Sequence, residues 1–157
     1  MIRFLPALLV FLAACDVTVD GDSADPGPDA VYLAMPGTEA LDLPFSSAVR
    51  VGNTLYLSGA IGYDREAGAL VEGGIQPETR KTLENISATL DAFGSSMDRV
   101  VKCTVLLADI GEWAAMNEVY TTFFPNKPAR SAFGTNGLAL GARVEIECVA
   151  VVGDQGN

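Results

Sequence analysis

The sequence has no histidine among its 157 residues. Histidine is the commonest general base of enzymes and the commonest protein ligand for zinc. Its absence excludes histidine-based catalytic triads and histidine-liganded zinc sites. Any catalysis by this chain therefore has to rest on carboxylates, hydroxyls, thiols or backbone groups.

Basic residues are also scarce, because 10 Lys and Arg stand against 20 Asp and Glu and give a net charge of −10. Nucleic-acid binding begins with the neutralisation of phosphates by clustered Lys and Arg. The charge balance therefore argues against a nucleic-acid partner and favours a small molecule or a protein. In this acidic chain Arg130 follows Pro128 at the start of an apolar stretch, which makes it the first candidate for binding an anion.

The length is enough for one domain with a hydrophobic core and too short for two ordinary domains. Apolar residues make up 49% of the chain, which is typical of globular proteins and not of disordered ones. We therefore expect a single globular domain.

Residues 1–14 have the pattern of an export signal. Arg3 is basic, residues 4–11 are apolar but too few to span a bilayer, and residues 12–14 form a small-residue cleavage site. The stretch LAAC at residues 12–15 resembles the bacterial lipobox, in which the cysteine, here Cys15, carries the lipid. We therefore expect a lipoprotein of the bacterial cell envelope, anchored in the inner or outer membrane on the periplasmic side. An ordinary secretory signal is the alternative.

Residues 15–36 follow this signal and contain Asp, Gly, Pro and Ser but no Lys or Arg. Such a composition cannot bury enough apolar surface to become ordered. It predicts a flexible acidic tether behind the lipid anchor, and it places the globular domain at residues 37–157.

Hydrophobic periodicity predicts the elements of this domain in the order ββαβαββ. Residues 48–51 and 54–58 form a hairpin around Gly52-Asn53, and residues 77–93 form a helix with Gly94 after its end. A strand follows in which one face carries Val101, Cys103, Val105 and Leu107.

A second helix ends before Pro125, and strands at residues 130–134 and 143–151 complete the order. Its apolar stripe is most simply core packing and consists of Trp113, Met116, Tyr120 and Phe123. The whole pattern predicts an α+β fold with one mixed sheet and two helices on one face.

Two cysteines, Cys103 and Cys148, lie on the apolar faces of their strands. Buried thiols are the first expectation for such positions. Export would place them in an oxidising compartment, so a disulfide between them stays open.

Four long segments of the domain resemble the RidA (YjgF) family of reactive-intermediate deaminases. These are PFSSAVRVGNTLYLSGAIG, LVEGGIQPETRKTLENISATLDAFGSSMDRVVKCTVLLADI, AAMNEVYTTFF and PARSAFGTNGLALGARVEIECVAV. Together they extend the resemblance over residues 41–152. It implies a chorismate-mutase-like RidA fold, a homotrimer with clefts between subunits, and hydrolysis of 2-imino and enamine acids to 2-oxo acids and ammonia. It implies no metal and no cofactor.

The resemblance also implies site residues. Arg130 of the PARS motif would grip the substrate carboxylate, for which a planar guanidinium is well suited, and the backbone beside Ala132 would add an N–H group. Glu145 would position a water beside the imine carbon. Ser58 and Gly59 would line the pocket, with the Ser58 hydroxyl orienting water or ligand.

Phe45 departs from the family pattern, because the best-known members have tyrosine there. The phenyl ring keeps the wall of the pocket but lacks the hydroxyl, which puts the rate and the substrate preference in question. An envelope location also fits a deaminase poorly, so a second class stays open, a non-catalytic trimeric module that binds a small carboxylate or an envelope partner. Phe45 and the tether favour this class, whereas Arg130 and Glu145 favour the enzyme.

Simpler roles remain open for the charged residues. Arg130 could form an ion pair with an acid of the protein. Glu145 and Glu147, two residues apart on one strand face, could both be solvated. If instead they met in a dry cleft, the pKa of one of them would rise and a proton-holding form would become available.

Overall fold

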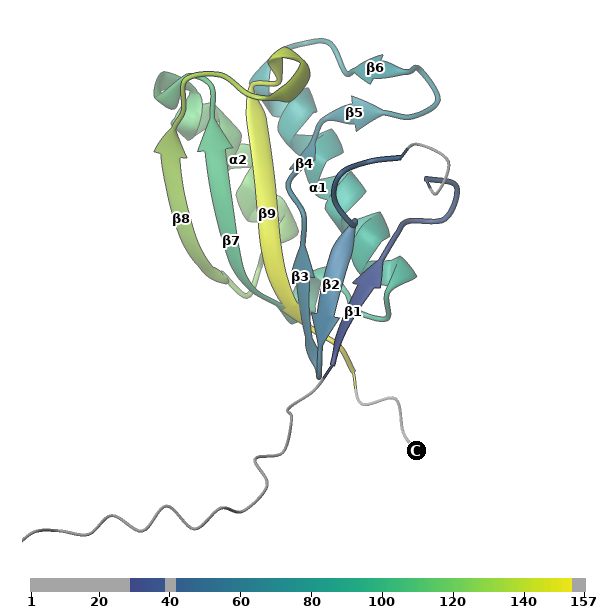
Figure 1. Ribbon diagram of the computed structural model, residues 1–157. Coiled ribbons are helices and arrows are strands. Elements are labelled where there is room, and N and C mark those ends of the chain that lie inside the picture. The colour runs from purple at the N-terminus through teal and green to yellow at the C-terminus, as the bar shows by residue number, and fades with distance from the viewer. Residues whose placement is uncertain (1–28, 39–41, 154–157) are drawn as a thin grey trace, which may run out of the picture.

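The structure is a computed structural model that describes residues 29–38 and 42–153 (Figure 1). The expected signal peptide, Cys15 and residues 16–28 of the expected tether lie outside the described residues. Among the described helices, none combines the length and the apolar character needed to cross a bilayer.

One mixed sheet forms the centre of the fold, with strands in the order β1-β2-β3-β9-β7-β8 and with β4 also pairing with β9. Its pairs are antiparallel except for β7 and β8, which run parallel. The strands are β1 (Ala30–Leu33), β2 (Ala48–Val51), β3 (Thr54–Leu57), β4 (Ala60–Ile61), β7 (Val100–Leu107), β8 (Ala129–Gly134) and β9 (Val144–Val151). A separate small hairpin consists of β5 (Tyr63–Asp64) and β6 (Ala69–Leu70).

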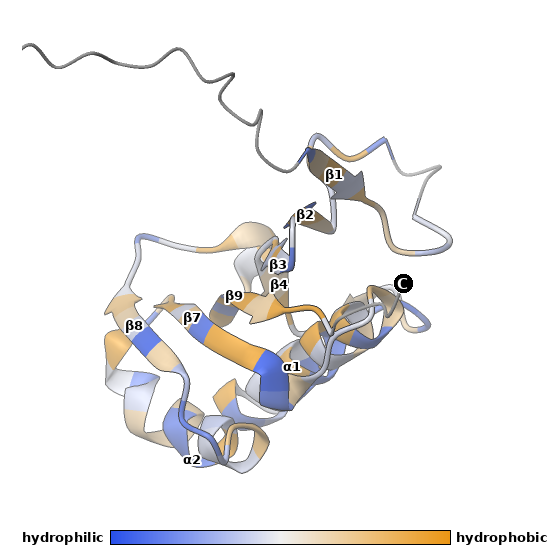
Figure 2. Cartoon of the chain, turned by 90° about the horizontal axis from the view of Figure 1, so that it is seen from below, coloured by the Kyte–Doolittle hydropathy of each residue, from blue (hydrophilic) through white to orange (hydrophobic). Residues whose placement is uncertain are grey.

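Two α-helices, α1 (Ile75–Ala92) and α2 (Trp113–Phe123), cover the same face of this sheet (Figures 1 and 2). Short 3-10 turns lie at η2 (Met97–Arg99), η3 (Ile110–Glu112) and η4 (Ala139–Gly141). The predicted α+β class, with one mixed sheet and two helices on one face, is confirmed.

Alternation along β9 shows how the core forms. Every second residue of this strand is buried under the helices, namely Val144, Ile146, Cys148 and Ala150. The helices meet them with Leu83, Ile86, Leu90 and Met116, each at most 1% exposed. The side chains of the intervening residues lie on the opposite face of the sheet, which is turned away from the helices.

The end of α1 follows its predicted signal. Gly94 has a φ of 77°, in the left-handed region that glycine adopts at low cost. Its N–H donates to the carbonyl of Asp91, and the N–H of Ser95 donates to the carbonyl of Leu90 at 2.9 Å. This pattern satisfies carbonyls that a helix end leaves unpaired, so the predicted stop at Gly94 is confirmed.

Part of the expected tether is ordered. Residues 30–33 form β1, which pairs with β2 over four residues. The prediction of a tether was based on the average composition of residues 15–36. It did not take account of the short run Val31-Tyr32-Leu33, which has high β-propensity. The predicted start of the domain at residue 37 is therefore too late.

Two expected core positions are also wrong. Val101 is the extra residue of a β-bulge, so Val100 takes the buried position and Val101 is 48% exposed. Trp113 is the first residue of α2 and remains 48% exposed, whereas Met116 and Tyr120 of the same stripe are buried. The order ββαβαββ omitted β1 and the two-residue strands β4, β5 and β6, which are too short to show a period.

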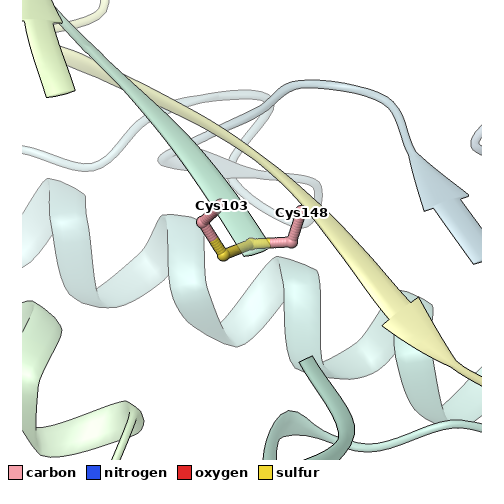
Figure 3. The surroundings of a disulfide bond; sticks show 2 residues. All are labelled: Cys103 and Cys148. Carbon is pink, nitrogen blue, oxygen red and sulfur yellow. A yellow bond between two sulfur atoms is a disulfide. The ribbon is translucent and has the colours of Figure 1, made fainter. Parts of the chain in front are cut away.

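Cys103 and Cys148 face each other directly across β7 and β9 and are joined by a disulfide (Figure 3). Both residues are at most 2% exposed. The expectation of buried free thiols is therefore wrong, and the alternative that the sequence left open holds.

We expect reduction of this disulfide to destabilise the domain. The bond closes a loop with a sequence separation of 45, for which chain entropy predicts a loss of about 4 kcal/mol in the free energy of unfolding. Denaturant unfolding of a protein beginning at residue 16, with and without reductant, measures this loss. The double variant Cys103→Ala/Cys148→Ala should not respond to reductant. Two titratable thiols in the unfolded, unreduced parent would contradict the bond.

Candidate functional site

Arg130 lies on β8, the edge strand of the sheet, in register with Cys103 of β7. This register places its side chain on the face covered by the helices. There its guanidinium donates a hydrogen bond to the Asn117 side-chain oxygen at 2.8 Å and lies 4.5 Å from the centre of the Tyr120 ring. Asn117 and Tyr120, three residues apart, belong to one face of α2. We call Arg130, Asn117 and Tyr120 the arginine cluster.

Tyr120 supplies an aromatic face without adding a negative charge. Burial raises the pKa of Tyr120 above its ordinary value of 10.0, and the Arg130 cation acts in the opposite direction. The phenol therefore stays neutral near pH 7. Its ring attracts the guanidinium of Arg130 through a cation–π contact and so helps to orient it.

The guanidinium of Arg130 keeps donors for an anion. Among residues 29–38 and 42–153 it makes no ion pair, so the alternative of an ion pair with an acid does not hold within these residues. Its protein partner is the neutral amide of Asn117, which accepts from one of five N–H groups. Because the side chain is only partly buried, the remaining N–H groups can reach a ligand.

Ala132 lies two residues along β8 from Arg130, and its side chain packs against the core. The proposed contact between the backbone at Ala132 and a carboxylate stays a prediction.

Glu145 lies on β9, between the buried Val144 and Ile146, and faces away from the helices. Its strand partners are Leu106 of β7 and Ile61 of β4. Its carboxylate is therefore half-buried and lies between two aliphatic neighbours on the open face of the sheet.

Gly59 makes room for this carboxylate. A Cβ atom at residue 59 would overlap Oε1 of Glu145 and lie 2.9 Å from its Cδ. The absence of a side chain therefore lets the backbone approach Glu145 closely.

The hydroxyl of Ser58 donates to the carbonyl of Ser46 at 2.6 Å, and its N–H donates to the carbonyl of Ser47 at 3.1 Å. These bonds tie the end of β3 to the segment that carries Phe45, whose side chain is 58% exposed. The hydroxyl proton is thus used within the protein, and the oxygen can only accept from a water or ligand. We call Glu145, Gly59 and Ser58 the glutamate cluster.

Glu147 shares the open face with Glu145 but is exposed. It borders a shallow hollow of about 150 Å³ together with Tyr56, Lys102 and Thr104. The possibility that the two acids meet in a dry cleft, which the strand period had raised, is therefore not met within the described residues.

The two clusters lie on opposite faces of the sheet. Two strand spacings of about 4.8 Å and three residues of about 3.3 Å put the Cα atoms of Arg130 and Glu145 about 14 Å apart. Their side chains then diverge further. Neither cluster lines the larger hollow of about 500 Å³, which lies beside α1 between Asp64, Arg80 and Glu84.

Sequence reasoning missed part of the arginine cluster. Asn117 was not singled out, and Tyr120 was interpreted as core only. A polar residue that interrupts the apolar stripe of α2 was the available signal. Trp113, one turn before Asn117, presents a half-exposed indole near the same face.

Within the described ranges, no cluster of three or more acidic or cysteine side chains could hold a metal ion. The expected absence of a metal and a cofactor stays a prediction.

The chain has many relatives. Residues 38–152 match the protein family described as Endoribonuclease L-PSP. Over 111 residues the chain is 45% identical to the Mus musculus protein named 2-iminobutanoate/2-iminopropanoate deaminase, covering 70% of this chain and 82% of that protein. The Homo sapiens protein of the same name is 46% identical over 70% of this chain and 81% of its own length. The crystal structure of RidA from the Antarctic bacterium Psychrobacter sp. PAMC 21119 superposes with a TM-score of 0.66 at 38% identity, covering 77% of this chain and 94% of that chain.

We expect Gly59→Ala to destabilise the domain by about 1–3 kcal/mol, because the new methyl group overlaps the Glu145 carboxylate. In a Glu145→Ala background the overlap is gone, and the same substitution should cost close to nothing. Denaturant unfolding of the four proteins of this double-mutant cycle measures the difference. Equal costs in both backgrounds would show that the two residues are not in contact.

Proposed function

The chain belongs to the family described as Endoribonuclease L-PSP, which is the RidA (YjgF) family, and we propose that it hydrolyses 2-imino and enamine acids to 2-oxo acids and ammonia. The observation that carries this proposal is the pair of clusters on a chain 45% identical to a 2-iminobutanoate/2-iminopropanoate deaminase. One cluster offers an unpaired cation for a carboxylate. The other offers a half-buried carboxylate for a water.

Arg130 would bind the carboxylate of the substrate. Its guanidinium presents two parallel N–H groups to the two carboxylate oxygens, a geometry that lysine cannot offer. Asn117 and Tyr120 fix the guanidinium before the substrate arrives, so little side-chain entropy is lost on binding. The substrate is therefore an acid.

Glu145 would act on water. Its carboxylate takes a proton as the water oxygen adds to the imine carbon, and a tetrahedral carbinolamine forms. The same carboxyl group gives this proton to the imine nitrogen, which becomes an amine. The carboxylate then takes the proton of the new hydroxyl group and passes it to the amine, so that ammonia leaves as the carbonyl of the 2-oxo acid forms. One imino acid and one water yield one 2-oxo acid and one ammonia, so the balance needs no further reactant.

Both steps require Arg130 and Glu145 to face one substrate, and a homotrimer with clefts between subunits would provide this. The separation of the clusters within a chain supports a shared site. The open sheet face supports it too, because exposed apolar side chains lie there, including Tyr56, Phe133 and Val151. A second copy of the chain, placed head to tail and closing a ring of three, would cover them.

The family description names a ribonuclease activity, and the charge of this chain disfavours it. A phosphate backbone would meet 20 acidic side chains and only 10 basic ones. A small carboxylate carries one charge and needs only one cation, which Arg130 can supply.

We further propose that the protein is a lipoprotein of the cell envelope, attached through Cys15. The LAAC stretch is the first support for this proposal. The buried disulfide between Cys103 and Cys148 is the second, since such bonds persist in oxidising compartments outside the cytosol.

The variants of Arg130 and Glu145 should separate binding from chemistry. Arg130→Ala should lower kcat/KM by about 10- to 100-fold and weaken 2-oxo acid binding alike, and Arg130→Lys should rescue little. Glu145→Gln should lower kcat by about 100- to 10,000-fold while 2-oxo acid affinity survives. Ammonia release from freshly generated 2-iminopropionate, beside calorimetric binding, measures both.

Arg99→Ala and Glu66→Gln are the matched controls, since both side chains are exposed and lie outside the two clusters. Phe45→Tyr should raise turnover by restoring a hydroxyl. A parent that binds 2-oxo acids through Arg130 but hydrolyses no imine would instead be a binding module.

Cys15→Ser should release the protein from membranes or block its maturation, because the lipid-bearing thiol is lost. Fractionation of cells into membrane and soluble parts measures this, with Ser23→Ala in the tether as the control. Unchanged membrane association of Cys15→Ser would reject the lipid anchor.

A further inference from the structure

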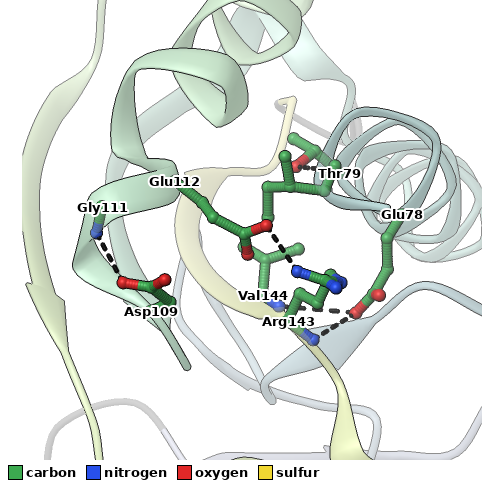
Figure 4. Close-up of polar contacts among 8 residues, drawn as sticks. Glu78, Thr79, Asp109, Gly111, Glu112, Arg143 and Val144 are labelled. Carbon is green, nitrogen blue, oxygen red and sulfur yellow. Dashed lines mark hydrogen bonds and ion pairs between the residues drawn. The ribbon is translucent and has the colours of Figure 1, made fainter. Parts of the chain in front are cut away.

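Glu78 is a buried acid in the first turn of α1, only 4% exposed. Its Oε1 accepts hydrogen bonds from the backbone N–H of Arg143 at 2.7 Å and, more weakly, of Val144 at 3.4 Å (Figure 4). These two residues directly precede Glu145 in the chain. A side chain 65 residues away in sequence thus holds the start of β9.

The buried carboxylate serves the backbone and not an ion pair. Arg143, whose N–H it binds, directs its own guanidinium to Glu112 (Figure 4). Burial of a carboxylate is unfavourable unless hydrogen bonds replace its water, and backbone N–H groups are strong donors to an anion. The observed bonds therefore keep a fixed distance between α1 and the first residues of β9.

Glu78 also sets the position of the strand on the other side of Glu145. A Cβ atom at Gly62 would overlap Cγ of Glu78 and lie 2.8 Å from its carbonyl oxygen, so the chain rests directly on Glu78 there. Gly62 follows β4, whose Ile61 pairs with Glu145. Asn85, two turns along α1, donates from its amide to the carbonyls of Ile61 and Tyr63, both at 3.0 Å.

We infer that Glu78 is a positioning residue that holds the Glu145 carboxylate in place against Gly59. The inference rests on the proposed function, in which Glu145 handles the proton. Glu78 touches both chain segments that meet at the glutamate cluster. The arginine cluster lies on another strand and on the opposite face of the sheet, so a change at Glu78 should alter chemistry and leave carboxylate binding intact.

Two substitutions of similar size separate the hydrogen bonds of Glu78 from its volume. Glu78→Gln keeps an acceptor oxygen for the two N–H groups, and Glu78→Met removes it while it fills the space. We expect kcat to fall about 10- to 100-fold in Glu78→Met and by no more than about threefold in Glu78→Gln, with 2-oxo acid affinity within about twofold of the parent in both. Thr79→Val is the control, because this neighbouring buried hydroxyl bonds within its own helix.

All variants are measured at one temperature, about 20 °C below the lowest of their melting temperatures, so that a loss of stability is not mistaken for a loss of chemistry. If Glu78→Met does not fold, Glu78→Asp replaces it, since the shorter side chain withdraws the carboxylate from Arg143. Equal losses of kcat and affinity, or an unchanged kcat in the folded variant, would overturn the inference.

Hydrogen exchange at the backbone amides of Arg143 and Val144 reads the same positioning without any activity. Protection of these amides should fall about tenfold or more in Glu78→Met and persist in Glu78→Gln. A parent that hydrolyses no imine would refute the proposed function. Unchanged protection in Glu78→Met would refute the role of Glu78, whatever the activity.

Discussion

Adjacent residues of a β-strand point to opposite faces of a sheet, and this alternation sets the layout of the whole site. Glu145 alternates with buried residues of β9 and therefore faces away from the helices, whereas Arg130 shares the helix-covered face with Cys103. A shift of one residue in either strand would exchange the faces. It would also bury a charge or expose the core, so the hydrophobic pattern that folds the sheet also holds the two functional side chains apart.

Most of the large elements could be predicted, because period and turn chemistry are local. The helix at α1 and its stop at Gly94, the hairpin of β2 and β3, and the strands β7 and β9 all follow from short windows of sequence. The bulge at Val101 could not be predicted, since it depends on how β7 pairs with β9, about 50 residues further along the chain. The same holds for the disulfide, which requires Cys103 and Cys148 to lie directly opposite each other.

The site was accessible to sequence reasoning only in part. Resemblance to a family identified Arg130 and Glu145, but the residues that fix them belong to other elements and carry no local signal. Asn117 orients Arg130 from α2, and Glu78 holds the strand of Glu145 from α1. The sequence identified Gly59 only as part of the pocket wall. That its missing side chain leaves space for the Glu145 carboxylate can be seen only in the three-dimensional structure. Long-range polar contacts are thus what a pattern along the chain leaves undetermined.

The central claim is that one active site takes Arg130 from one chain and Glu145 from another. The direct measurement is imine hydrolysis by mixed trimers of Arg130→Ala and Glu145→Ala chains, co-refolded in equal amounts and verified as mixed by mass spectrometry. Each variant alone should retain no more than about a tenth of the parental activity. If the site is shared, random mixing restores about a quarter of the interfaces, and the mixture should regain about a quarter of the parental activity. Mixed trimers with no regained activity would contradict the account.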